Sequence, residues 1–563
     1  MQPNNKRRRY KYWIIYGFSF IVFVLVFIAV VAERFVEPVL KARIHTLIIE
    51  GSDSLYNYHL GDLDASFLGA NVEVKDLQIN VDSIQYKKLE AANDLPSITM
   101  QLNMERGYIK GVAIFTLLFS KRISIDEIMT SDANVRLIRT LNSNLKEKNL
   151  HTPLWKSIQP GIKSIAINTI NLDGIKLLYR YADTSSSVKL QFDTCNAVFK
   201  DILIDSVAAF DTARIGFTKD ISLRFSDLKF RTPDSMSKMK AEVISYSSKK
   251  KTFELVNFKI QPTREEKNDF YGYVNKQKAM EVIEFEKATF TNFQLDRFVN
   301  NNIIAADSII IEKPDVKIFL DKSYPPLLES KIGTYPHQRL LGTDATVIIK
   351  GMEVKNASIE YIEKAEKTKQ EGTVKFRNLN LYISNLTNDS FSIRNNNKCI
   401  AKAEGLILNN SPIKASFVFY LDSANGAFDV SGSISDVDSE ALNALAVPLA
   451  NVQFKTFNLS RLDFALHGDD YKTKANVRML YNDLFIVIQK KNEETGLMEN
   501  KKFLTKIINK YTLHSSNPSP GQQERTAKEV IRLRISSHGF FGLIWKTIFS
   551  GMQNIMIRQG QYE

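Results

Sequence analysis

Residues that could do chemistry are few and scattered along this 563-residue chain. No histidine belongs to an HxH or HExxH pair or has a carboxylate at ligand spacing, which favours structural or solvated roles for His45, His59, His151, His337, His467, His514 and His538. The sequence has no GxSxG elbow, Walker loop or dinucleotide fingerprint. We therefore expect no catalytic residue, no metal, no cofactor and no enzyme, although a hydrolase with an unfamiliar site stays open.

The paired carboxylates and the two cysteines carry equally little chemistry. Asp469-Asp470 and Glu493-Glu494 lie in polar, turn-like contexts, which predict solvated loops rather than general acid–base work. Cys195 and Cys399 are too few for a disulfide scaffold, and both one bridge and two buried thiols remain open.

The formal net charge of +13 is also poor support for a nucleic-acid partner. Much of it comes from Lys6, Arg7, Arg8, Arg9 and Lys11, and the remaining basic residues are interspersed with acidic ones. No recognition module accompanies them, so we expect no nucleic acid. A modest basic excess instead suits contact with anionic lipid head groups.

The stretch 12–32 contains no charged residue and follows those five basic residues. As a helix it would be about 31 Å long, enough to cross a bilayer once. Its large side chains, the predicted membrane anchor, include Trp13, Ile14, Phe18, Phe20, Phe23, Leu25 and Phe27. The positive-inside rule places the basic tail 1–11 in the cytosol and the bulk on the far side. A cleaved secretory signal is the alternative, and it also exports the bulk.

Beyond a membrane-proximal helix at 33–51, the apolar period changes from that of a helix to two. Alternating strands with one apolar face predict a mainly β fold, most simply a long meandering antiparallel sheet. A pattern of short strand, break and short strand recurs at 72–81, 221–230, 352–361 and 374–383, while 123–137 and 309–319 are predicted to pair two strands through a turn. The apolar faces provide the candidate groove residues Ile98, Met100, Leu102, Met104, Ile165, Ile167, Ile221, Leu223, Phe225, Val374 and Phe376.

Few helices are predicted to cover these faces. One is a short apolar turn at 111–119, and another is a helix at 439–449, capped by Ser439 and broken at Pro448. The apolar faces must therefore close on each other in a sandwich or barrel, or curl into a groove that holds foreign apolar matter. Alternation alone leaves both architectures open.

The carboxyl end is predicted to contain a linker or exposed loop at 514–527, then a last strand and an amphipathic helix within 528–563. The apolar face of that helix contains Phe541, Ile544, Trp545, Ile548, Met552 and Ile555. Such a helix suits a membrane interface or the open end of a groove, and packing on the last sheet is the alternative.

The order of elements and the block 98–137 (ITMQLNMERGYIKGVAIFTLLFSKRISIDEIMTSDANVRL) resemble the AsmA-like family of bacterial envelope proteins. Ala133 stands where the family often has proline, while Pro314 fits the later copy. Segments 428–434 (FDVSGSI), 462–468 (LDFALHG) and 477–488 (VRMLYNDLFIVI) resemble the family's later region.

This resemblance implies a single-pass inner-membrane protein of a Gram-negative type envelope, with an elongated, curled β-groove over 52–513 in the periplasm. Its implied function is lipid binding and transfer in support of outer-membrane phospholipid transport, with phospholipid acyl chains in the groove. Implied partners are the inner membrane and the outer membrane or its proteins. A structural module for outer-membrane protein assembly is the alternative.

Overall fold

The computed structural model describes Ile49, Ser52 and residues 54–66, 71–92, 95–96, 98–113, 120–139, 163–181, 190–232, 234–491 and 498–558. The predicted tail 1–11, anchor 12–32, most of the helix 33–51 and most of the turn 111–119 lie outside these residues. Among the described residues, no helix combines the length and the apolar character needed to cross a bilayer.

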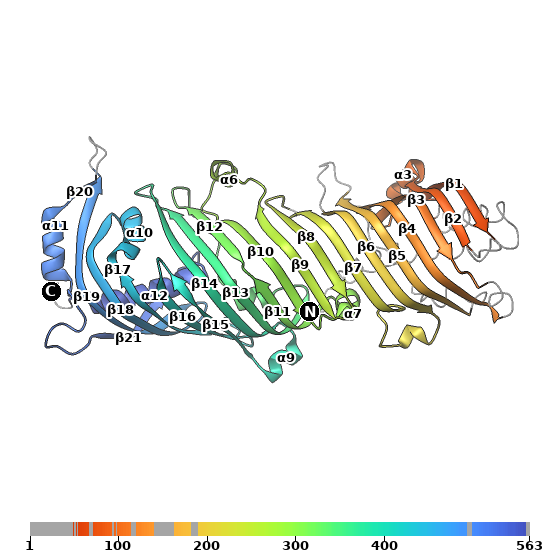
Figure 1. The fold of residues 1–563 in the computed structure, drawn as a ribbon. Helices are drawn as coiled ribbons and strands as arrows, with labels where there is room; N and C mark the ends of the chain where they lie inside the picture. The colour runs from red at the N-terminus through yellow and green to blue at the C-terminus, as the bar shows by residue number, and fades with distance from the viewer. Residues whose placement is uncertain are drawn as a thin grey trace. The chain divides into compact units, whose positions relative to one another are not determined.

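The described part of the chain is mainly β, with 59% strand and 18% helix, which confirms the mainly β part of the predicted fold class. Its 21 strands pair into one mixed sheet (Figure 1). The strands are β1 (Tyr56–Ser66), β2 (Asn71–Val81), β3 (Ile98–Lys110), β4 (Arg122–Arg139), β5 (Ser164–Tyr181), β6 (Leu190–Ile204), β7 (Thr218–Arg231), β8 (Ser237–Ser247), β9 (Thr252–Pro262), β10 (Met280–Thr291), β11 (Ile303–Glu312), β12 (Asp315–Asp321), β13 (Thr346–Lys364), β14 (Glu371–Thr387), β15 (Lys398–Ile407), β16 (Ser411–Tyr420), β17 (Phe428–Asp438), β18 (Val452–Gly468), β19 (Lys472–Lys491), β20 (Met498–Asn500) and β21 (Thr526–Leu533).

Short helices connect or cover these strands within the described residues. They are α3 (Ser83–Ala91), the 3₁₀ turn Ala208–Phe210, α6 (Lys267–Val274), α7 (Leu295–Asn301), α8 (Pro336–Leu341), α9 (Ser390–Asn395), α10 (Ser439–Ala450), α11 (Lys502–Ile507), the π-helical turn Ile508–Thr512 and α12 (Phe540–Met556). Asp438, rather than the predicted Ser439, caps α10, because its carboxylate accepts the Ala441 N–H at 2.7 Å. Pro448 lies inside this helix, which ends two residues later.

The expectation of a purely antiparallel sheet is wrong. Strand β4 pairs in parallel with β5, and β12 pairs in parallel with β13. Parallel neighbours need a long crossover connection, and residues 322–345, which contain α8, provide it between β12 and β13. Apolar alternation has the same period in both kinds of pair, so the sequence pattern could not distinguish them.

The breaks noted in the sequence are left-handed residues within continuous strands. Asp76, Asp227, Asn356 and Asn378 have φ values of 52°, 54°, 56° and 49°, inside β2, β7, β13 and β14 respectively. Asp and Asn adopt this backbone region more readily than most residues. Segment 123–137 is likewise the single strand β4, bent at Asp132, whereas 309–319 is the predicted pair of strands joined by a turn.

Each left-handed residue preserves the buried face of its strand. In β2, Val72 and Val74 are buried before Asp76, and Leu77 and Ile79 are buried after it. The extra residue changes which positions point inward from even to odd numbers, as a β-bulge does. Each strand therefore bends without exposing its apolar side chains.

The chain divides into two compact units: unit 1 is Met1–Phe258 with Thr291–Ile303, and unit 2 is Lys259–Phe290 with Ile304–Glu563. The core of unit 1 lies on one face of β2–β6 and includes Leu77, Met104 and Ile125. The core of unit 2 lies between β15–β19, β21 and α12, and includes Phe428, Met479 and Ile548. Each unit thus buries its own apolar cluster.

Candidate functional site

In unit 1, the apolar side chains of β3 and β5 are more deeply buried than those of β7. Of the predicted groove residues, Leu102, Met104, Ile165 and Ile167 are at most 3% exposed and belong to the core of unit 1. Ile98 and Ile221 are also buried, and Met100 is half-buried. The first strands therefore bury this face within the protein.

On β7, Leu223 and Phe225 are half-buried and follow Ile221 on the same face. Their partners on β6 are Ala197 and Cys195, and the rings of Phe225 and Phe192 have centroids 5.0 Å apart. Alternate residues of β7 point the other way and are exposed, as Ser222 and Arg224 are. Unit 1 thus presents half-exposed apolar side chains on one face and polar ones on the other.

Unit 2 repeats this arrangement on β13, β14 and β15. Val374 and Phe376 are half-buried; Val374 is opposite Tyr361, and Phe376 is opposite Ile359 and Ile407. On the other face, Lys375 and Arg377 are exposed. These apolar side chains are not members of the buried cluster of unit 2, although α10 packs on the same face of β14, where Leu449 lies against Gly372.

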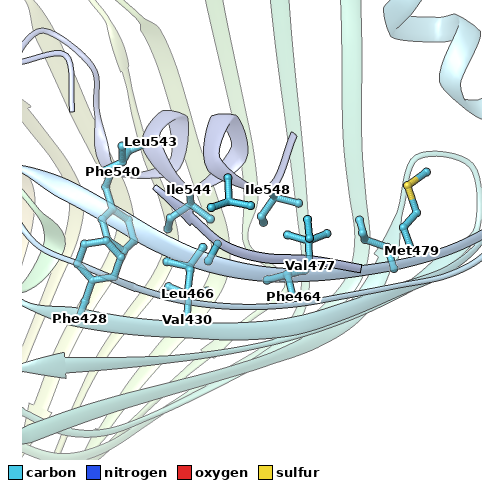
Figure 2. Close-up of a cluster of buried hydrophobic side chains, with 14 of the residues drawn as sticks. Phe428, Val430, Phe464, Leu466, Val477, Met479, Phe540, Leu543, Ile544 and Ile548 are labelled. Atoms are coloured by element: carbon cyan, nitrogen blue, oxygen red, sulfur yellow. The ribbon is translucent and has the colours of Figure 1, made fainter. Parts of the chain in front are cut away.

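Helix α12 covers the same face farther along unit 2 (Figure 2). Ile544, Ile548 and Ile555 of the predicted apolar face are buried against the sheet. A Cβ on Gly551 would collide with the side chain of Val477, so the glycine allows close packing. Packing on the last sheet, one of the two alternatives, is therefore what the structure contains.

The rest of the predicted helix face lies elsewhere. Phe541 and Trp545 are 68% and 52% exposed, whereas Met552 is half-buried and packs against the core of unit 2. Phe549 extends this second stripe, with its ring centroid 6.1 Å from that of Trp545. Helix α12 is therefore apolar on two sides. The helical spacing in the sequence predicted a single apolar face that contains residues of both.

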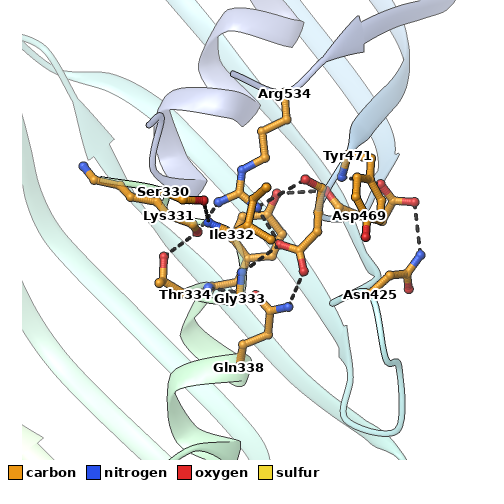
Figure 3. Close-up of polar contacts among 12 residues, drawn as sticks. Ser330, Lys331, Ile332, Gly333, Thr334, Gln338, Asn425, Asp469, Tyr471 and Arg534 are labelled. Atoms are coloured by element: carbon orange, nitrogen blue, oxygen red, sulfur yellow. Dashed lines mark hydrogen bonds and ion pairs between the residues drawn. The ribbon is translucent and has the colours of Figure 1, made fainter. Parts of the chain in front are cut away.

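The most deeply buried ion pair among the described residues joins Arg534 to Asp470. Figure 3 shows the polar contacts around Arg534. Arg534 donates to Asp470 at 2.5 Å and to the Lys331 carbonyl, and its guanidinium lies 4.3 Å from the Tyr335 ring centroid. Gln338 donates to the other Asp470 oxygen at 2.6 Å. This cluster fastens the crossover 322–345 to the β18–β19 turn, so the solvated loop predicted for Asp470 is wrong.

The loop predicted at 514–527 is also firmly held. Asn517 is 1% exposed, its side-chain amide donates to the Met479 carbonyl at 2.5 Å, and its carbonyl oxygen accepts the Arg525 N–H at 2.8 Å. Strand β21 then begins at Thr526, earlier than predicted.

Other reactive groups offer no site within the described residues. No group of three or more His, Cys, Asp or Glu side chains there could hold a metal. Cys195 and Cys399 are both free and buried, in different units. Burial raises the pKa of Cys195 to about 12 and that of Cys399 to about 11, so neither is an activated thiolate.

No protein-family model matches this chain, and no curated protein is significantly similar to it.

Proposed function

We propose that this protein is a membrane-anchored periplasmic lipid-binding and transfer protein that holds acyl chains along an elongated, curled apolar β-groove. The observation that carries the proposal is the half-exposed apolar face in each unit, formed by Leu223 and Phe225 in unit 1 and by Val374 and Phe376 in unit 2. An apolar surface that the protein covers only in part favours an apolar ligand. The membrane anchor, the periplasmic location and the role in outer-membrane phospholipid transport rest on the sequence and its family resemblance.

The chemistry of these faces suits acyl chains. Burying a methylene group stabilises a complex by about 0.8 kcal/mol, and such contacts have no preferred direction, so a chain can slide along them. Head groups would stay in water. No bond is made or broken in this function, in keeping with the scarcity of reactive groups.

Photo-crosslinking of the full-length chain in phospholipid vesicles tests the proposal. We expect p-benzoylphenylalanine at position 223 or 376 to form phospholipid adducts, detected by mass spectrometry. The same probe at positions 224 and 377, on the exposed polar face, is the matched control. Equal labelling at all four positions, or labelling at none, would contradict lipid binding on the apolar face.

A second candidate is a structural or assembly module for outer-membrane proteins. It is favoured by the closed clusters, because Leu102, Met104, Ile165 and Ile167 are packed by the protein itself and α12 covers part of unit 2. In the crosslinking experiment, protein adducts without lipid adducts at positions 223 and 376 would support this candidate.

A further inference from the structure

The helical segment Lys502–Thr512 lies beside β19 in unit 2, where α11 continues into the π-helical turn (Figure 1). Two polar side chains fix it to that strand. The Ile488 N–H donates to the Thr505 hydroxyl at 3.1 Å, and the Asn509 side chain both accepts the Ile486 N–H at 2.9 Å and donates to the Ile486 carbonyl at 2.7 Å. One side of the helical segment is therefore bound to the sheet, and the other sides face away from it.

Lysines at four-residue spacing form one exposed stripe, Lys502, Lys506 and Lys510. Among the described residues, no carboxylate lies within 4.0 Å of their ammonium groups. Beside this stripe, Phe503, Leu504 and Tyr511 are 76%, 47% and 48% exposed. We call these six residues the α11 surface.

A depression of about 490 Å³ lies against the α11 surface. Leu484, Phe485 and Val487 of β19 form its apolar part, and the same three lysines line it from the helical segment. Its remaining lining residues are the neutral Asn500, Thr505, Asn509 and Ser515. The depression thus combines an apolar wall with positive charge and no described carboxylate.

We propose that the α11 surface docks onto a bilayer that contains anionic phospholipid. Phe503, Leu504 and Tyr511 would enter the interface, where aromatic and aliphatic side chains bind favourably, while the lysine ammonium groups contact lipid phosphates. Charge complementarity selects this occupant, because three lysines that have no carboxylate partner among the described residues lie on the same helical segment as three exposed apolar side chains. A nucleic acid would match the lysines but leave Phe503 and Leu504 in water.

This inference is independent of the proposed lipid-binding faces. It needs only contact with a membrane surface, and it rests on side chains of β19 and the helical segment that the proposed function does not use. Loss of vesicle capture with unchanged crosslinking at positions 223 and 376 would therefore separate the two.

Vesicle capture by the full-length chain tests the docking. The protein, kept in amphipol, is immobilised through an amino-terminal tag and exposed to phosphatidylcholine vesicles with or without phosphatidylglycerol. We expect capture of the phosphatidylglycerol vesicles, weakened by high salt. Replacing the three lysines together (Lys502→Gln, Lys506→Gln, Lys510→Gln) should weaken capture about 100-fold, given about 1 kcal/mol for each basic residue near an anionic surface.

Two further variants make the test specific. The matched control is Lys367→Gln, Lys369→Gln, Lys402→Gln, which removes the same charge from exposed lysines elsewhere in unit 2 and should leave capture unchanged. Phe503→Ser with Leu504→Ser should weaken capture while its salt dependence remains. Equal capture by the two lysine variants, equal capture of both vesicle types, or displacement by inorganic phosphate alone would overturn the docking.

Discussion

At the scale of single residues, Leu102 and Leu223 show how one sequence pattern covers two environments. Leu102 is 3% exposed and belongs to a closed cluster, whereas Leu223 is half-buried on the same kind of apolar face. The burial of a leucine depends on what lies over it, and alternation along its own strand carries no such information. Only the half-buried residues are free to contact a ligand without displacing protein atoms.

Placing an aspartate at these two positions should therefore have different effects. Leu102→Asp buries an unpaired carboxylate and should lower the free energy of unfolding by at least about 3 kcal/mol. Leu223→Asp should lower it less, by about 1–2 kcal/mol of lost apolar burial, since its carboxylate reaches water, but should reduce bound phospholipid. Thermal unfolding and lipid extraction measure the two effects, with Ser222→Asp on the exposed face as the control. Unchanged lipid content in Leu223→Asp would count against the groove.

His337 should make folding sensitive to acid. It is 3% exposed, neither ring nitrogen has a hydrogen-bond partner in the described structure, and burial lowers its pKa to about 4. The unfolded side chain binds a proton below its ordinary pKa of 6.5, so this contribution to stability is present above that value and is lost as the pH falls toward 4, by up to about 3 kcal/mol. His337→Phe should preserve the contact with Phe419, whose ring centroid is 5.0 Å away, and flatten the dependence. Urea midpoints at neutral and mildly acidic pH measure the change. The same pH dependence of stability in His337→Phe and in the unmodified protein would refute the role of His337.

At the scale of elements, the left-handed residues decide which way each strand presents its side chains. Gly405 of β15 lies against the bend at Asn378, where a Cβ would be 2.9 Å from the Leu379 Cα and 3.0 Å from the Arg377 carbonyl oxygen. The bend in β14 and the glycine opposite it therefore form one local structure. The sequence Asn378-Leu379-Asn380 is as typical of a turn as of a bend. The sequence pattern therefore predicted two short strands at 374–383, where the structure has one bent strand.

Asn378→Val should destabilise unit 2 by about 1–2 kcal/mol, because a β-branched residue is strained in the left-handed region. Asn378→Gly should be nearly neutral, since glycine adopts positive φ freely. Hydrogen exchange of β14 and β15 measures the local effect. Equal stability of the valine and glycine variants would show that the left-handed backbone is unimportant there.

The two glycines of α12 predict opposite responses to alanine. Gly551→Ala should destabilise the packing on β19, because overpacking costs about 1–3 kcal/mol and the gain in helix propensity is only about 1 kcal/mol. Gly542→Ala has open space around its Cβ and should stabilise the helix by about 0.5–1 kcal/mol. Trp545 fluorescence during urea unfolding follows both variants. Stabilisation by both would mean that Val477 moves aside easily.

At the scale of the whole molecule, the apolar clusters of the two units share no residue, and each is built from its own strands. Leu102→Asp should therefore increase hydrogen exchange in β2–β6 and leave β17–β19 unchanged. Peptide-resolved exchange by mass spectrometry measures this. An equal increase in both regions would show that the units fold as one.

Much of this architecture could be predicted from the sequence, for particular physical reasons. Alternation around Ile98, Leu102 and Met104 predicted a strand, and helical spacing around Ile544, Ile548 and Ile555 predicted a helix that the structure contains at Phe540–Met556. The parallel pairs, the burial of Asp470 and the exposure of Phe541 could not be predicted. Each depends on a neighbour distant in sequence, such as Arg534 for Asp470, and a single strand or turn contains no record of its partner.

The bends at the left-handed residues imply that each of these strands has a fixed frame of alternation, which sets whether odd-numbered or even-numbered side chains point inward. Upstream of Asn378 the inward positions are even-numbered, and downstream they are odd-numbered, so the frame changes at one fixed residue. A one-residue deletion elsewhere in β14 would invert the side chains between the deletion and the nearer strand end, whereas removal of Asn378 itself would restore regular alternation and leave the inward side chains of both halves facing inward. Insertions and deletions during evolution would then accumulate in pairs within a strand, each restoring the frame that the other shifted.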